Sequence, residues 1–255
     1  MPDDASAVRT EAGAAAPFAG FTGRGVKIGV IDSGVHAGHP HIGRVAGGVA
    51  ISPRGAVEEG EAACLDRLGH GTAVAAAIQE KAPDAEVHAV KVFDDALRTT
   101  GTALLAAVDW CIDNGMDLVN LSLGSANPDH EFAFEAVARR AEAAGILLVA
   151  ARSADGAACY PGRLPTVLGV ELDWDCPRDG YRRTGDAFCA SGFPRPIPGV
   201  EPRRNLYGMS FAVANMTGVA ARAWEAVGSG GGPERAGLVR RALHLGRLEA
   251  SESQT

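Results

Sequence analysis

Short apolar runs alternate along the chain with longer stretches of helical pattern, and this alternation constrains the fold more than any other feature. Parallel strands need crossover connections, usually helices, so the alternation predicts an α/β fold of three layers: a mainly parallel sheet with helices on both faces. The expected strands cover residues 26–31, 86–92, 117–123, 146–151 and 166–170. The expected helices cover residues 71–80, 102–114, 129–144, 208–227 and 233–245.

The ends of two expected helices carry recognisable signals. Gly115 and Gly145 each follow a helical pattern and are expected to stop it, because glycine readily adopts the left-handed conformation at a helix C-terminus. Asp129 is the expected N-cap of the second of these helices. We expect a single domain over residues 21–248, with an N-terminal tail over 1–20 and a disordered, polar C-terminal tail over 249–255.

Charge and hydropathy exclude several classes of function. The 255 residues carry a formal net charge of −7, so no nucleic-acid partner is expected. No apolar run approaches the roughly 18–20 residues of a membrane span, so no membrane partner is expected either. The first 20 residues contain three acidic side chains and no apolar core of the kind found in signal peptides.

The cysteines and histidines do not predict a metal site. Five cysteines, an odd number, are scattered without a CxxC pair, which favours a reducing compartment, although a Cys159–Cys176 bridge stays open. His36, His39 and His41 form a cluster that no carboxylate or cysteine joins. We therefore expect no metal and no cofactor.

Three polar residues stand where a parallel sheet gathers its functional groups, beyond the carboxyl ends of strands and at helix N-termini. Asp32 directly follows the run 26–31, His70 lies between two glycines ahead of a helix, and Ser210 lies near the start of another helix. Each alone has an ordinary interpretation, the last two as helix caps. A dinucleotide site is not expected, because the only nearby GxG string, 23–25, precedes the strand rather than following it.

Taken together, the order Asp, His, Ser is one of the known orders of the Ser-His-Asp triad, that of subtilisin. The surrounding strings also fit, and the chain resembles the subtilisin-like serine proteases (subtilases, the peptidase S8 family) from about residue 26 to residue 223. The matching segments are 30–35 (VIDSGV), 69–72 (GHGT), 89–92 (AVKV), 120–124 (NLSLG), 160–167 (YPGRLPTV) and 208–212 (GMSFA).

The resemblance implies a role for each matching residue. Ser210 would attack a peptide carbonyl, His70 would carry the proton, and Asp32 would orient the imidazole and stabilise its cation. Ser122, Leu123 and Gly124 match the family's substrate-binding strand, whose backbone would pair with an extended peptide.

The resemblance fails at one functional position. The family carries an oxyanion-hole Asn after the strand that matches residues 146–151, whereas the matching string here is Arg152-Ser153-Ala154-Asp155, with Ala154 or Asp155 at the Asn position. Loss of one such donor typically costs on the order of 10²–10³ in kcat. Three interpretations stay open: another group such as Ser153 or Arg152 substitutes, the enzyme is slow but sufficient for one substrate, or the chain is a pseudoenzyme that binds peptides.

The sequence therefore predicts a cytoplasmic serine endopeptidase dedicated to a peptide or leader-peptide substrate. The alternative is a catalytically impaired subtilase that acts as a peptide-binding or assembly module. The expected partner is a peptide or protein substrate, and the sequence does not address the oligomeric state.

Overall fold

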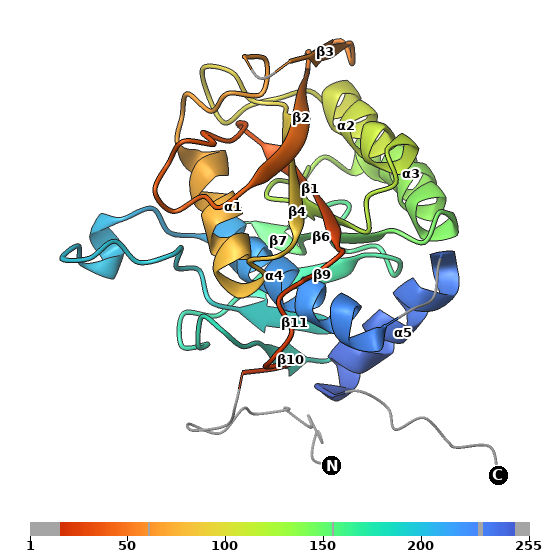
Figure 1. Ribbon diagram of the computed structural model, residues 1–255. Helices are drawn as coiled ribbons and strands as arrows, with labels where there is room; N and C mark the ends of the chain where they lie inside the picture. The colour runs from red at the N-terminus through yellow and green to blue at the C-terminus, as the bar shows by residue number, and fades with distance from the viewer. Residues whose placement is uncertain (1–15, 61, 155, 229–231, 248–255) are drawn as a thin grey trace.

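A nine-stranded sheet forms the middle layer of the computed structural model (Figure 1), with the strand order β10-β11-β9-β6-β5-β1-β4-β2-β3. The structure describes residues 16–60, 62–154, 156–228 and 232–247. The strands from β11 to β2 run parallel, and an antiparallel partner closes each edge, β10 on β11 and β3 on β2. This arrangement confirms the expected three-layer α/β fold with a mainly parallel sheet.

The strands of the sheet are β1 (Lys27–Asp32), β2 (Val45–Ile51), β3 (Val57–Glu59), β4 (Glu86–Lys91), β5 (Leu118–Leu121), β6 (Leu147–Ala151), β9 (Leu168–Leu172), β10 (Arg182–Thr184) and β11 (Ala187–Ala190). A small hairpin is formed by β7 (Ser153–Ala154) and β8 (Ala157–Ala158). The helices are α1 (His70–Lys81), α2 (Gly101–Asp113), α3 (Glu131–Ala143), α4 (Met209–Val227) and α5 (Gly232–Leu245), with 3-10 turns η1 (Pro128–His130) and η2 (Pro202–Arg204).

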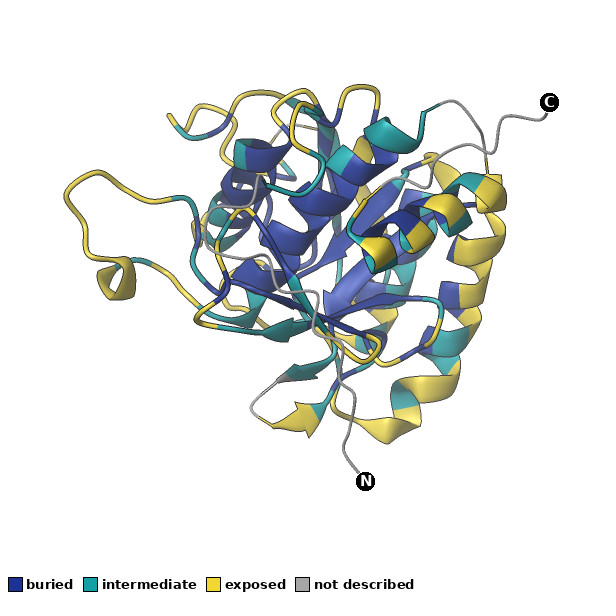
Figure 2. Cartoon of the chain, turned by 90° about the horizontal axis from the view of Figure 1, so that it is seen from below, coloured by how far each residue is buried: buried dark blue, intermediate teal, exposed yellow. Residues whose placement is uncertain are grey.

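Two buried apolar clusters lie on opposite faces of the sheet. One joins the sheet to α1, α4 and α5, and the other joins it to α2 and α3. Along β1 the side chains alternate, since Ile28 and Val30 belong to the first cluster and Ile31 to the second. Seen from below, dark blue buried residues fill the centre while the outer helix faces are exposed (Figure 2).

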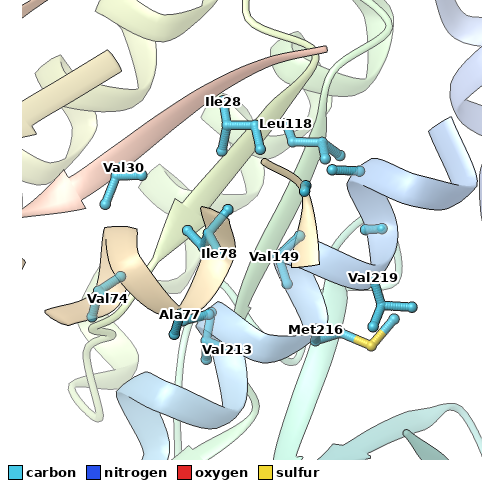
Figure 3. Packing of buried hydrophobic residues seen from close by; sticks show 14 of the residues in the cluster. Ile28, Val30, Val74, Ala77, Ile78, Leu118, Val149, Val213, Met216 and Val219 are labelled. Carbon is cyan, nitrogen blue, oxygen red and sulfur yellow. The ribbon is translucent and has the colours of Figure 1, made fainter. Parts of the chain in front are cut away.

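The helices α1 and α4 pack against each other over the first cluster. Figure 3 shows Ala77 and Ile78 of α1 close to Val213 of α4, with Val149 of β6 nearby. Close approach depends on small residues here, because a Cβ added to Gly218 of α4 would lie 2.9 Å from the Cβ of Lys81. Both helices begin at the carboxyl end of the sheet, where the expected polar residues lie.

The expected elements exist, although several of their bounds and one cap differ. The expected strand 117–123 is only Leu118–Leu121, because its pairing with β1 ends at Leu121 and Ile31. Asp129 is not the helix cap: Asn127 accepts the capping hydrogen bond, from the backbone N–H of Asp129 at 3.0 Å, and opens η1 ahead of α3. Gly115 and Gly145 adopt φ values of +62° and +78°, as expected of helix stops.

Several strands carry too little signal to be predicted. β2 contains the pair Gly47-Gly48, which breaks its apolar pattern, yet a Cβ at Gly48 would lie 2.4 Å from the carbonyl oxygen of Ala89. The strands β10 and β11 are three and four residues long and form the edge hairpin. Their pairing is set by tertiary contacts rather than by local pattern.

Two further expectations concerned the chain termini and a disulfide bridge. The expected C-terminal tail, 249–255, and most of the expected N-terminal tail lie outside the described residues. Cys176 is a buried thiol without a disulfide, so the bridge to Cys159 left open by the sequence is not formed. Within the described ranges, the helices are too short or too polar to cross a bilayer.

Candidate active site

Asp32 is the last residue of β1 and is completely buried. Its Oδ1 atom accepts hydrogen bonds from the backbone N–H of Ser33 and from Nδ1 of His70, both at 2.7 Å. Its Oδ2 atom is also buried and accepts no hydrogen bond from the residues that the structure describes. The carboxylate therefore sits at the carboxyl end of a central strand with one oxygen committed to the imidazole.

His70 is the first residue of α1, and the glycines on either side explain how it reaches Asp32. Gly69 adopts φ +80°, which favours glycine, and turns the chain into the helix. Gly71 lies against the loop after β1, where an added Cβ would be 2.2 Å from the carbonyl oxygen of Gly34 and 3.1 Å from Asp32 Oδ1. Only a residue without a Cβ lets the two backbones approach closely enough for the 2.7 Å contact.

The hydrogen bond to Asp32 fixes the state of the imidazole. Nδ1 carries the proton that the carboxylate accepts, which leaves Nε2 as the basic atom of the neutral ring. Burial would lower the pKa of His70, but the hydrogen bond to Asp32 and the negative charges of Asp32 and Asp66 outweigh it, so this pKa lies above its ordinary value of 6.5. The side chain remains 13% exposed, enough for contact with a bound molecule.

Ser210 is the second residue of α4, after Gly208 in the turn that enters the helix. Its hydroxyl donates to the carbonyl oxygen of Ser122 at 3.0 Å. The next residue, Phe211, packs its ring against the imidazole of His70 with centroids 5.7 Å apart. Ser210 thus lies between the end of β5 and His70, and its one proton must leave the Ser122 carbonyl before it can be given to a base.

A buried polar chain ties α4 to β5 behind Ser210. Thr217 Oγ1 donates to Asn120 Oδ1 at 3.0 Å, and Asn120 Nδ2 donates to Ser122 Oγ at 2.8 Å. All three residues are buried. This chain holds the start of α4 in register with the strand end, and sequence reasoning did not single out Thr217.

Asp66 is a second carboxylate that sequence reasoning missed. It accepts hydrogen bonds from Ser33 Oγ, from Thr72 Oγ1 and N, and from the backbone N–H groups of Leu68 and Gly69, at 2.6–2.9 Å. Burial alone would raise the pKa of Asp66, but the hydrogen bonds from Thr72 and Ser33 lower it. Because Ser33 follows Asp32 and Thr72 lies two residues after His70, Asp66 fastens together the two segments that carry the dyad.

The expected substrate-binding residues form an accessible edge beside Ser210. Ser122 is buried, Leu123 half-buried and Gly124 exposed, and all three lie beyond the last paired residue of β5. Ser125 then pairs with Tyr160 through two backbone hydrogen bonds of 2.9 Å, which anchors the far end of the segment.

Two of the residues expected in the oxyanion region, Ser153 and Ala154, lie in a short hairpin. Ser153 and Ala154 form β7, which pairs with β8 in a short hairpin, and Asp155 lies outside the described residues. In the described part of the chain, Ser153 makes no hydrogen bond with Ser210. The neighbouring Arg152 is engaged elsewhere, with its Nε 3.7 Å from Glu171 Oε1.

His36, His39 and His41 lie on the loop after β1, but they do not form a metal centre. Among the described residues, no group of three or more His, Cys, Asp or Glu side chains is arranged to hold a metal ion. The site thus consists of a buried carboxylate at the end of β1, an oriented imidazole at the start of α1 and a serine hydroxyl at the start of α4.

The chain is similar in sequence to known proteins. The model of the subtilase family matches residues 23–170. The chain is 33% identical over 213 residues to Subtilisin BL of Lederbergia lenta, covering 79% of this chain and 74% of that protein. It is 32% identical over 213 residues to an alkaline protease of Alkalihalobacillus alcalophilus, covering 79% of this chain but only 52% of the relative's length.

Solved structures agree in fold. A cold adapted subtilisin-like serine proteinase superposes with a TM-score of 0.63 at 22% identity, over 87% of this chain and 83% of that one. The prenylagaramide maturation protease PagA superposes with a TM-score of 0.63 at 25% identity, over 90% of this chain and 86% of that one. Fold and sequence together define a protein of the subtilisin-like serine protease class. The chain belongs to the subtilase family.

Proposed function

We propose that this chain is a serine endopeptidase that cleaves peptide bonds with Ser210 as nucleophile, His70 as general base and acid, and Asp32 as the group that orients the imidazole. The observation that carries the proposal is the 2.7 Å hydrogen bond between His70 Nδ1 and the buried Asp32 Oδ1. It leaves Nε2 of a partly exposed ring as the proton acceptor, in a family of serine proteases.

The proposed reaction starts when a substrate peptide lies along residues 122–124. The Ser210 hydroxyl leaves the Ser122 carbonyl, donates its proton to His70 Nε2, and Oγ attacks the scissile carbonyl carbon. His70 then gives the proton to the departing amine, and water completes the hydrolysis of the acyl-enzyme by the same proton route. Throughout, the Asp32 carboxylate stabilises the imidazolium by charge and by its hydrogen bond.

The start of α4 supports the developing oxyanion. Ser210 is the second residue of a 19-residue helix, where backbone N–H groups have no acceptor within the helix and the dipole favours negative charge. This backbone contribution reduces the dependence on a side-chain donor from residues 153–155. We place the oxyanion region there and at Ser153, Ala154 and Asp155.

We further propose a dedicated peptide or leader-peptide substrate and a cytoplasmic location. The similarity to a protein named as a maturation protease supports the first. The second draws on buried thiols such as Cys111 and Cys176, which suit a reducing compartment.

The competing proposal is a catalytically impaired subtilase that binds peptides or serves in an assembly. It is favoured by the string of residues 149–160, which contains no Asn to serve as the family's oxyanion donor. It keeps the substrate edge at residues 122–124 and dispenses with turnover.

Labelling with a fluorophosphonate probe separates the two proposals. The probe phosphonylates an activated serine, so we expect an adduct on Ser210 in the wild type, none in Ser210→Ala, and an undiminished adduct in the matched control Ser52→Ala. Circular dichroism must show the same fold in all three proteins. A folded wild type without a Ser210-dependent adduct would refute the endopeptidase and leave the binding module.

A further inference from the structure

A cavity of about 430 Å³ opens beside His70 and takes no part in the triad. Its walls are the loop after β1, the turn that leads into α1, and the segment 194–206. In both views this segment stands out from the body as an exposed arm near the start of α1 (Figures 1 and 2). Gly69 and Thr72, next to His70 in the chain, form the inner rim of the cavity.

The position of the cavity relates it to one side of the scissile bond. Residues 122–124 continue β5, whereas the cavity is lined by the loop that continues β1, the neighbouring strand in the sheet. Ser210 contacts the Ser122 carbonyl on the first side. On the second side, the ring of His70 packs against Phe211, and Gly69, the residue before His70, lines the cavity. A peptide whose acyl part pairs with residues 122–124 therefore directs its leaving part, the part that His70 protonates, toward the cavity.

The charges that line the cavity are opposite to those of the chain as a whole. The net charge of the chain is −7, yet five of the lining side chains are basic or can become cationic: His36, His39, His41, Arg67 and Arg195. Among the described residues that line the cavity, Asp66 alone is acidic, and its oxygens are already occupied by Ser33, Thr72 and two backbone N–H groups. Among the residues that the structure describes, no carboxylate forms an ion pair with Arg67 or Arg195.

Two of these side chains keep donor groups that the described hydrogen bonds leave unused. Arg195 is half-buried, and its Nη1 donates to the carbonyl oxygen of His41 at 3.0 Å, which holds the guanidinium while leaving its other N–H groups available. His39 Nδ1 accepts the backbone N–H of His41 at 3.1 Å, which leaves Nε2 as the ring nitrogen that can donate.

His41 lies close to positive charge. Its pKa is lowered from the ordinary value, first by burial and then by the positive charges of Arg195 and His39, against a weaker opposing effect of Glu80. Burial would disfavour a charge of either sign, but the contribution of the nearby positive charges favours a bound anion.

We propose that this cavity, lined by His36, His39, His41, Arg67 and Arg195, binds a carboxylate in the part of the substrate that leaves first, and so selects peptides with an acidic group shortly after the cleaved bond. The inference rests on the proposed endopeptidase function and deepens it by naming a substrate class. The carboxylate belongs either to an Asp or Glu side chain or to the C-terminus of a short leaving segment.

The test uses the full-length protein and begins with the fluorophosphonate labelling described above. A mixed peptide library with mass-spectrometric readout then locates cleaved bonds, and one cleaved peptide is remade with Glu or Gln at each of the first three positions after the bond. We expect kcat/KM to be about 10-fold higher for Glu at one of these positions, the effect of one charge-assisted contact worth about 1.4 kcal/mol. A parallel pair that ends in a free carboxylate or a carboxamide distinguishes the two sources of the anion.

Variants assign the preference to the cavity. Arg195→Gln keeps a donor for the His41 carbonyl but removes the charge, and we expect the Glu-to-Gln ratio to fall to within about 2-fold of unity. Arg67→Gln removes an exposed charge from the cavity lining without touching the His41 contact, and it should lower the ratio as well. Arg139→Gln, on the outer face of α3, is the matched control and should keep the wild-type ratio.

The outcomes are separable. An enzyme that labels at Ser210 and cleaves peptides, but shows equal rates for acidic and neutral leaving segments, overturns the inference and leaves the proposed function standing. The same holds if the preference survives in both Arg195→Gln and Arg67→Gln. Absence of Ser210-dependent labelling refutes the proposed function and this inference with it.

Discussion

Lys81, the last residue of α1, carries a positive charge that is almost completely buried. Its side chain is 2% exposed, with Nζ 3.2 Å from Glu80 Oε2 and 3.4 Å from the carbonyl oxygen of Ala77. Burial lowers its pKa from 10.5 to about 8, although the charge of Glu80 opposes the change. That difference corresponds to about 3 kcal/mol by which the ammonium form disfavours the folded state at neutral pH.

The substitution Lys81→Met removes this penalty while keeping most of the side-chain volume. Glu80 is not left unpaired by the change, because Arg178 Nη1 donates to its Oε1 at 3.1 Å. At pH 7 Lys81 is protonated in both the folded and the unfolded wild type, so we expect the variant to be more stable by up to about 3 kcal/mol.

The pH dependence has a definite sign. Between the folded pKa of about 8 and the unfolded value of 10.5, the unfolded wild type binds more protons than the folded one, so its stability rises with pH relative to the variant. At pH 9.5 the advantage of Lys81→Met should have shrunk by about 2 kcal/mol. The buried thiols of Cys111 and Cys176, whose pKa values burial raises, act in the opposite direction but equally in both proteins.

The assay is urea unfolding of both proteins at pH 7 and pH 9.5, followed by circular dichroism. Lys27→Met, which removes an exposed ammonium group from β1, is the control and should change the free energy of unfolding by no more than about 0.5 kcal/mol. A difference between wild type and Lys81→Met that is the same at both pH values, or a variant less stable than wild type at pH 7, refutes the reasoning.

Further predictions concern the dyad and its glycine. Asp32→Asn should lower kcat about 10⁴-fold, the loss typical of triads whose carboxylate becomes an amide, in a steady-state peptide assay. In the wild type, kcat/KM should fall toward acidic pH with a midpoint above 6.5, because protonated His70 cannot accept the serine proton. This midpoint should move to lower pH in Asp32→Asn, because the carboxylate that opposes the effect of burial on the His70 pKa is then gone. Gly71→Ala places a Cβ 2.2 Å from the Gly34 carbonyl oxygen and should cost roughly 1–3 kcal/mol in thermal unfolding and most of the activity. Gly237→Ala in α5, with no atom within 4 Å of the added Cβ, should instead stabilise by roughly 0.5–1 kcal/mol.

The central strands and the long helices were predictable because their patterns are local. β1 and β6 are continuous apolar runs, and the glycines after α2 and α3 adopt the conformation that ends a helix. The edge strands were not predictable, since Gly47 and Gly48 of β2 are placed by close contact with β4 rather than by their own preference.

The residues of the candidate site also divide into those that were predictable from the sequence and those that were not. Asp32, His70 and Ser210 stand in short strings whose residue types are unusual enough to be found in the sequence. Asp66 and Thr217 act through hydrogen bonds to residues from 2 to 97 positions away, and an isolated Asp or Thr gives no sign of such partners. Thr217 is completely buried in α4, as is Asn215, and a polar residue within a mainly apolar stretch of helix was the one available signal for it.

The small residues of the two central helices connect composition to the site. His70 begins α1 and Ser210 begins α4, so the separation of the two side chains is set by how closely these helices pack. An added Cβ on Gly218 would meet Lys81 Cβ at 2.9 Å, and Ala77 of α1 packs beside Val213 of α4 (Figure 3). A larger residue at either place would move the helix axes apart by more than the tolerance of a hydrogen bond, of about 0.5 Å. The helix interface, from about one to three turns away from the triad residues, therefore determines whether the nucleophile and its base can meet.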